Sequence, residues 1–191
     1  MKKFFLILVL VGGFINAQNV IYVDGTLSTG AQIGINWENS VKEPLYLKKI
    51  KHSGYIKLLY GQGTLSTNNP AFKDIDGSGF IFETGKRIYF NKEEIKGFYT
   101  GFGFGIGSLE FEQNNFYDTS VFGGDGKFYG EYRYFYVPIE LGYKFLIAQK
   151  IAFNIYAGTN FNIERSPKGD VSNSSFDNIV PRLGLAVGYS F

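Results

Sequence analysis

Apolar and polar residues alternate along most of the chain after its first seventeen residues. In the last nine positions, the odd residues from Leu183 to Phe191 are large and apolar, and the even residues from Gly184 to Ser190 are small. A period of two is typical of a β-strand with one apolar face. The same pattern recurs in seven further segments, so we predict eight strands: 19–27, 30–40, 53–63, 78–90, 98–111, 132–146, 151–163 and 181–191.

Two places depart from a regular alternation. The apolar parity slips near Ser108, and we expect a β-bulge there, beyond which Leu109 and Phe111 continue the apolar face. Lys86 falls on the apolar face of its segment. Either its side chain reaches along the surface to a polar region, or the register changes at this point.

The connections between the predicted strands differ in length. Three are fairly short and polar, at 41–52, 91–96 and 147–150, and three are long and rich in Asn, Asp, Ser and Gly, at 64–77, 113–131 and 164–177. Only the tight first hairpin, around Ser28–Gly30, breaks this alternation. An even number of strands with long loops at one end and short turns at the other predicts a transmembrane β-barrel whose long loops lie outside the cell.

The side chains on the two faces of the strands distinguish a barrel in lipid from a soluble β-sandwich. One face carries Phe, Leu, Ile and Tyr, and the other carries Gly, Ala, Asn and Ser with single charges. An eight-stranded barrel has a narrow interior that suits small residues and paired charges, whereas its closed exterior can face hydrocarbon. We therefore predict an all-β, eight-stranded antiparallel up-and-down transmembrane barrel.

Four acidic and four basic residues fall on the face opposite the apolar one. Unpaired charges in a narrow interior cost several kcal/mol per ion, so we expect these residues to form a salt-bridged polar plug rather than an open channel. The alternative is that some of them lie unpaired at wet strand ends. The eight residues are Asp24, Glu38, Lys57, Glu83, Arg87, Glu140, Lys144 and Arg182.

The first seventeen residues have the features of a secretory signal peptide. Lys2 and Lys3 precede an apolar stretch from Phe4 to Val11, and Ala17 offers a small residue for cleavage. The stretch is shorter than the roughly 20 residues that a membrane-spanning helix needs. We predict a signal peptide over 1–17 and a barrel domain over 18–191.

Composition excludes several classes of function. With 19 basic and 17 acidic residues among 191, and no basic block, the chain is not predicted to bind nucleic acid. It has no cysteine and one histidine, which argues against disulfide frameworks, thiol nucleophiles and Cys/His metal sites. We predict no cofactor and no metal.

The C-terminal strand supports a resemblance to known proteins. Leu185, Val187, Tyr189 and Phe191 at alternating positions resemble the signal that the barrel-insertion machinery of the outer membrane reads. Segment 87–99 resembles a turn of uncharacterised small outer-membrane proteins of Bacteroidota, which are similar in shape to the OmpA transmembrane domain and OmpX. The resemblance implies a barrel in the bacterial outer membrane, with membrane lipid and the insertion machinery as partners, and does not indicate an activity.

Candidate chemistry is sparse. His52 is predicted to point away from the lumen at the periplasmic side, whereas lipid-modifying barrels resemble one another in placing catalytic groups toward the outer leaflet. Asp74 and Asp76 start a segment that resembles a calcium loop, but Gly85 stands where the final Glu ligand is expected. The alternate glycines from 101 to 107 are interpreted as a lumen face with little side-chain volume, not as a nucleotide motif. No catalytic residue is assigned.

Four functions remain open at this stage. The first is a closed barrel with a structural or surface-interaction role, binding an extracellular ligand through its long loops; loop 113–131 holds several aromatic residues that suit either a contact surface or a tall hairpin. The second is a narrow pore or small-solute binder gated by lumen charges. The third is a lipid-modifying enzyme, and the fourth is a soluble lipocalin-like carrier with its large apolar residues turned inward.

Overall fold

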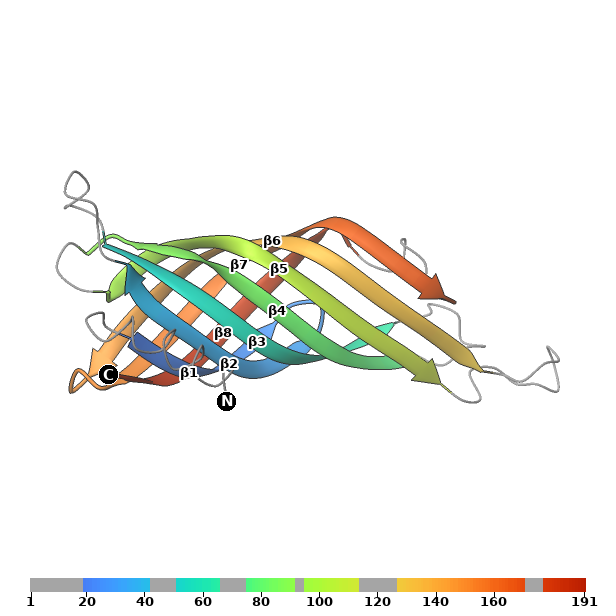
Figure 1. Ribbon diagram of the computed structural model, residues 1–191, viewed down its shortest axis with the longest axis horizontal. Helices are drawn as coiled ribbons and strands as arrows, with labels where there is room; N and C mark the ends of the chain where they lie inside the picture. The colour runs from blue at the N-terminus through green and yellow to red at the C-terminus, as the bar shows by residue number, and fades with distance from the viewer. Residues whose placement is uncertain (1–18, 42–50, 66–74, 92–94, 114–126, 171–176) are drawn as a thin grey trace, which may run out of the picture.

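The chain forms a closed barrel of eight antiparallel strands, as predicted (Figure 1). The computed structural model describes residues 19–41, 51–65, 75–91, 95–113, 127–170 and 177–191, so the predicted signal peptide lies outside the described residues. Each strand pairs with its neighbours in sequence, and β1 pairs with β8 to close the barrel. The strands are β1 (Asn19–Leu27), β2 (Ala31–Val41), β3 (Lys51–Leu65), β4 (Ile75–Tyr89), β5 (Gly97–Gln113), β6 (Phe128–Ile147), β7 (Ile151–Gly169) and β8 (Ile179–Ser190).

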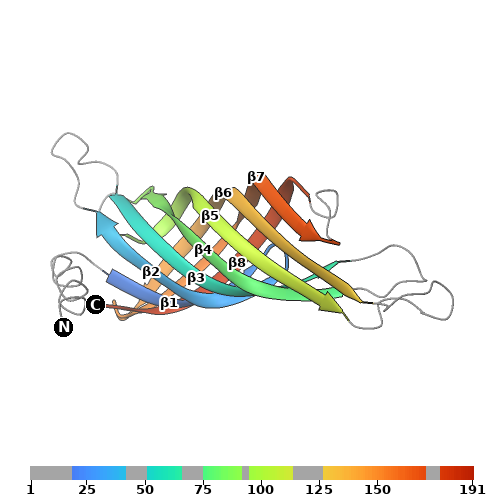
Figure 2. The same cartoon turned by 45° about the vertical axis from the view of Figure 1, so that its right-hand side comes forward.

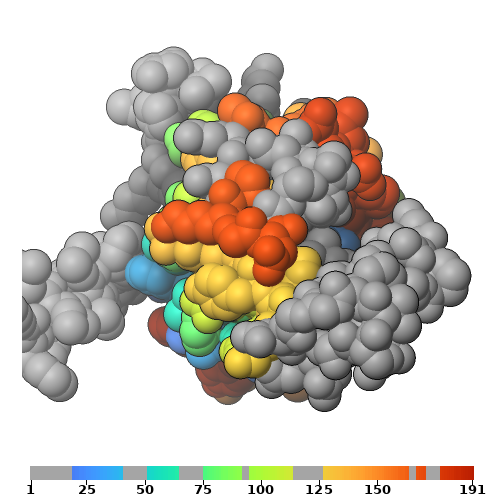
Figure 3. All heavy atoms as spheres, turned by 90° about the vertical axis from the view of Figure 1, so that its right-hand side faces the viewer, coloured from blue at the N-terminus to red at the C-terminus, as the bar shows by residue number. Residues whose placement is uncertain are grey.

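The two ends of the barrel differ in height. The short connections and the C-terminus lie at one end, where Asn19 and Phe191 exchange backbone hydrogen bonds of 3.1 and 2.9 Å. At the other end β5, β6 and β7 extend well beyond the β1–β2 hairpin (Figure 2). Figure 3 looks onto this long-loop end, where the tips of β6 and β7 come forward.

In the middle of the barrel and toward its short-turn end, the large apolar side chains point outward, as the alternation predicted. Phe98, Phe102, Phe104 and Ile106 of β5 are between 46% and 67% exposed, while the glycines between them face the interior. The outward rows of the other strands are similar. A soluble carrier would bury these residues, so the lipocalin-like alternative is wrong.

The predicted bulge at Ser108 is wrong. The pairing of β5 with β4 continues without interruption through this residue, and Leu109 and Phe111 point inward with only 2% and 1% exposure. The register shift lies instead between β6 and β7, at Phe135 and Tyr136. Odd-numbered side chains of β5 point inward along the whole strand. What changes near Ser108 is the environment of the two faces.

Most strands are also longer than predicted at the long-loop end. β5 continues to Gln113, β6 begins at Phe128 and β7 continues to Gly169, so parts of the predicted loops are strand. Phe128 points inward and Tyr129 outward, which makes these two loop aromatics part of a tall hairpin. The other aromatics of the predicted loop, Phe116, Tyr117 and Phe122, lie outside the described residues.

Inward tyrosines lie over inward glycines on the neighbouring strand. Tyr156 is directly opposite Gly184, and a Cβ atom at this glycine would come within 1.9 Å of the tyrosine ring. Tyr99 and Gly142 form an equivalent pair, with a corresponding distance of 2.3 Å. Because an eight-stranded barrel is narrow, a large ring can lie flat inside it only where the facing residue has no side chain.

Candidate functional site

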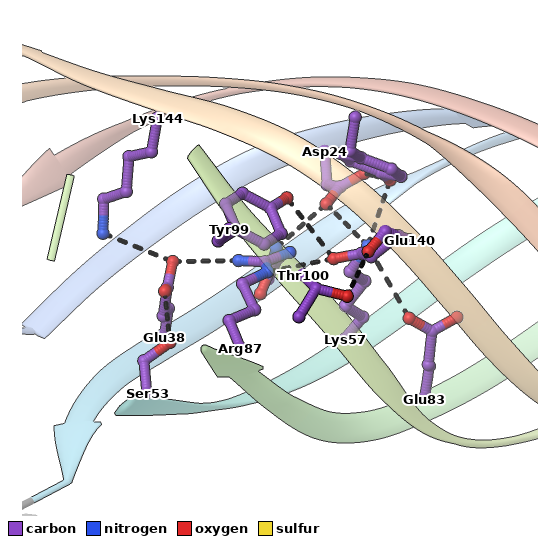
Figure 4. A network of polar contacts seen from close by, with 12 residues as sticks. Asp24, Glu38, Ser53, Lys57, Glu83, Arg87, Tyr99, Thr100, Glu140 and Lys144 are labelled. Atoms are coloured by element: carbon purple, nitrogen blue, oxygen red, sulfur yellow. Dashed lines mark hydrogen bonds and ion pairs between the residues drawn. The ribbon is translucent and has the colours of Figure 1, made fainter. Parts of the chain in front are cut away.

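The structure brings the eight predicted interior charges together inside the barrel. All of them except Arg182 are labelled in Figure 4. Each of them is no more than 1% exposed. They come from six strands: Asp24 from β1, Glu38 from β2, Lys57 from β3, Glu83 and Arg87 from β4, Glu140 and Lys144 from β6, and Arg182 from β8.

The charges form one continuous chain in which the sign alternates at every step. Starting near the short-turn end, Glu38 contacts Lys144 at 3.3 Å and Arg87 at 2.9 Å. Arg87 also contacts Glu140 at 3.0 Å, and Glu140 contacts Arg182 at 3.4 Å.

The second half of the chain continues from Arg182 to Asp24. Arg182 contacts Glu83 at 2.9 Å, Lys57 lies between Glu83 at 3.7 Å and Asp24 at 3.3 Å, and Asp24 ends the chain. Four acidic and four basic groups make the network neutral as a whole. A neutral, alternating chain offsets much of the cost of removing each ion from water.

Hydroxyl groups also bind carboxylates of the network. Glu38 accepts hydrogen bonds from Ser53 and Tyr89 at 2.5 Å and from Tyr22 at 3.0 Å. Tyr156 donates to Asp24 at 2.7 Å, and Tyr136 donates to Glu83 at 2.8 Å. These bonds hold the carboxylate oxygens of Glu38, Asp24 and Glu83 in place.

Aromatic rings pack against the cations. The Arg87 guanidinium lies 4.6 Å from the centre of the Tyr55 ring, and the Lys57 ammonium lies 4.2 Å from that of Tyr156. Such contacts suit desolvated cations. The inward glycine of β5, Gly101, makes room for Glu140, because a Cβ atom there would lie 2.7 Å from the Cγ atom of that residue.

On the long-loop side of the network the interior becomes apolar, which was not predicted from the sequence. A buried cluster fills the inner face of β3 to β6 toward the long-loop end. It consists of Leu59, Ile75, Ile81, Leu109, Phe111, Phe128, Tyr132, Tyr134 and Tyr136. The interior therefore has an apolar layer on the long-loop side of the ionic network.

The outer face changes character at the same height. On β5 the outward apolar row ends at Ile106 and is followed by Ser108, Glu110 and Glu112. On β6 the same change occurs between Phe135 and Arg133. On these two strands the large apolar residues point outward on the short-turn side of this level, and on the long-loop side all but Tyr129 point inward, as in a soluble protein. The sequence signals this change, because the large apolar residues of β5 move from even to odd positions near Ser108. The predicted bulge is not its cause.

The remaining candidates have no catalytic or metal-binding arrangement among the described residues. His52 lies on the outward face of β3 at its short-turn end, because its neighbour Ser53 points into the lumen. Asp76 is an exposed strand residue that accepts a hydrogen bond from Thr64, and Asp74 lies outside the described residues. The described part of the chain holds no group of three metal-ligating side chains.

The residues of the predicted insertion signal lie on the outward row of β8, with Phe191 directly after the end of the strand. Leu185, Val187, Tyr189 and Phe191 are between 41% and 62% exposed. Their recognition by the insertion machinery stays a prediction. The described residues contain no helix that is long and apolar enough to cross a membrane.

Fold and interior together define the class of protein: an eight-stranded barrel of the outer-membrane type. Ail, the attachment invasion locus protein of Yersinia pestis, has a similar structure, with a TM-score of 0.52 and 13% identity over 93% of this chain and all of that chain. A major outer membrane protein of Thermus thermophilus is similar with a TM-score of 0.59 and 9% identity over 92% of this chain and all of that one. No family model and no curated protein sequence matches the chain.

Proposed function

We propose that the protein is a sealed, integral barrel of the bacterial outer membrane that holds its long-loop end above the surface as a rigid platform. The observation that carries this proposal is the filled interior: eight interlocked charges with at most 1% exposure, below an apolar cluster. An open pore needs a continuous polar path, and two successive layers of different chemistry oppose one. The outward apolar row supports a position in lipid.

A conductance measurement tests whether the barrel is sealed. Purified protein is inserted into planar bilayers, with a general porin as the positive control. We expect the conductance to stay at the level of the bare bilayer, and to stay there in Glu140→Gln and Arg87→Gln, because the apolar layer remains intact in both. Insertion is checked by resistance of the protein to extraction with alkaline carbonate. A sustained conductance that changes in either variant would instead establish the narrow-pore alternative.

The platform at the long-loop end is acidic. The three predicted long loops contain eight acidic and four basic residues. A hollow of about 680 Å³ at this end is lined in part by Asp76, Glu110 and Glu112. The structurally similar Ail was determined in complex with a heparin analogue, sucrose octasulfate, which is a polyanion. The charge of this chain favours the opposite class of partner, a cationic protein or peptide segment.

Removing the acidic charges of the hollow tests this surface role. In the triple variant Asp76→Asn, Glu110→Gln, Glu112→Gln, we expect binding of a fluorescent oligolysine probe to proteoliposomes to weaken by about tenfold or more at low salt, because three exposed carboxylates are lost. Asp177→Asn removes an exposed charge outside the hollow and should change binding little. Equal weakening in both variants, or none in the triple variant, would exclude the hollow as the contact surface.

The enzyme alternative has less support. His52 is the only histidine of the chain and lies at the short-turn end, on the outer face. The carboxylates of the interior are engaged in ion pairs and hydrogen bonds, so no carboxylate of the network is placed to orient that imidazole.

A further inference from the structure

One charged side chain lies within the apolar outer surface of the barrel. Lys86 is exposed and points outward from β4, with Thr84 and Ile88 as its neighbours in the outward row and Phe82 and Phe90 one position further on either side. The pairing of β4 with β3 and with β5 continues through this residue without a shift. Its outward position therefore follows from the regular geometry of the strand, and the alternative of a changed register is wrong.

None of the described outward residues around Lys86 on the neighbouring strands is acidic. It lies opposite Gly54 on β3 and Phe102 on β5. The next outward residues on these strands are His52, Ile56, Thr100 and Phe104. The nearby carboxylates, such as Glu83, are on the other face of the sheet and are bound inside the barrel. A lysine on a lipid face is destabilising, most strongly at the midplane and less near the interface, so an anion in the lipid would stabilise this position.

A groove in the outer surface lies beside Lys86. It has a volume of about 220 Å³ and is lined by Trp37, Asn39, Gly54, Tyr55, Ile56, Thr84 and Gly85. Gly54, directly opposite Lys86, has no side chain, so the outer face is depressed between the neighbouring side chains. Trp37 and Ile56 give the groove an apolar wall that suits a hydrocarbon chain.

The position of Lys86 along β4 indicates which side of the membrane is involved. The residue lies near Tyr89, where the strand ends toward the short turns, and far from Ile75 at the long-loop end. The three predicted short connections contain seven basic and three acidic residues, the reverse of the balance in the long loops. This end of the barrel therefore attracts anionic headgroups.

We propose that Lys86 and the adjoining groove bind an anionic phospholipid of the leaflet at the short-turn end, with the phosphate on the lysine ammonium and an acyl chain against Trp37 and Ile56. The proposal rests on the position in the membrane proposed above. The lysine side chain extends toward the short-turn interface to reach the phosphate, as long cationic side chains do at membrane surfaces.

Trp37 is the only tryptophan of the chain and lines the groove, so its fluorescence reports the lipid bound there. The protein is reconstituted in phosphatidylcholine vesicles that contain either brominated phosphatidylglycerol or brominated phosphatidylcholine as quencher. We expect the anionic lipid to quench Trp37 with an apparent affinity about fivefold higher than that of the neutral lipid. In Lys86→Gln the ratio should fall to about one, and Lys86→Arg should retain most of it.

The matched control is Lys150→Gln, which removes an exposed lysine of the same end in the β6–β7 turn, away from the groove. It should keep the wild-type ratio. An equal fall in this variant would show only general attraction to an anionic surface and would overturn the proposal, as would an unchanged ratio in Lys86→Gln. Trp37 that neither lipid quenches, in a protein that sediments as a dimer, would assign the groove to a second copy. Extraction by carbonate would instead refute the position in the membrane.

Discussion

Replacing Glu38 by glutamine should lower the free energy of unfolding by about 3–5 kcal/mol, the cost of leaving a buried ion without its partner. Glu38 is the only described carboxylate that contacts Lys144, and it shares Arg87 with Glu140. Its removal leaves an excess positive charge in a region that water does not reach. Equilibrium urea unfolding in phospholipid vesicles, followed through the fluorescence of Trp37, measures the change.

Two further variants separate the loss of an ion pair from a general effect of the substitution. Glu112→Gln makes the same chemical change at an exposed position of β5 and should alter stability by less than about 0.5 kcal/mol. Glu38→Gln combined with Lys144→Met also removes the excess cation and should recover part of the loss. If Glu38→Gln and Glu112→Gln have equal effects, the network does not stabilise the barrel.

Gly184→Ala should destabilise the barrel by about 1–3 kcal/mol, the usual cost of overpacking an interior. The new methyl group would lie 1.9 Å from the Tyr156 ring. That ring cannot turn aside freely, because its hydroxyl group bonds to Asp24 and to Lys57 at 2.7 and 3.0 Å. The same unfolding measurement in vesicles gives the change.

Gly25→Ala is the matched control for this prediction. Gly25 faces outward, and the nearest atom to a Cβ there is the backbone oxygen of Leu185 at 3.7 Å, which is ordinary contact. The substitution should be neutral or slightly stabilising, because alanine restricts the unfolded chain. In a Tyr156→Ala background the cost of Gly184→Ala should largely disappear. A cost that persists there would mean that the ring is not its cause.

The alternation of side chains was sufficient to predict the barrel. A strand between lipid and a narrow interior must place large apolar residues on one face and small or polar ones on the other, and this requirement repeats at every second residue. The terminal strand from Leu183 to Phe191 carries the pattern completely. The eight charges that parity assigns to the inner face are each at most 1% exposed in the structure.

The alternation did not predict correctly which face is apolar where the strands extend beyond the apolar outer surface toward the long-loop end. At Leu109 and Phe111 the inner face becomes apolar because lipid no longer covers the outer face and the strands must bury a core of their own. In the sequence of β5 the large apolar residues change from even positions, up to Ile106, to odd positions, from Leu109 onward. The surroundings of the two faces, which depend on height in the barrel, explain this exchange without a bulge. The lengths of the strands at the long-loop end were underestimated for the same reason.

The chain alone thus encodes the number of strands, their two faces and the sign of each interior charge. The partners of those charges are decided by closure, because the stagger between strands sets which side chains meet at one height. Arg182 on β8 reaches Glu83 on β4 across the barrel, 99 positions apart in sequence. The alternation within one strand cannot predict this contact, because the two residues meet only when the eighth strand pairs with the first and closes the barrel.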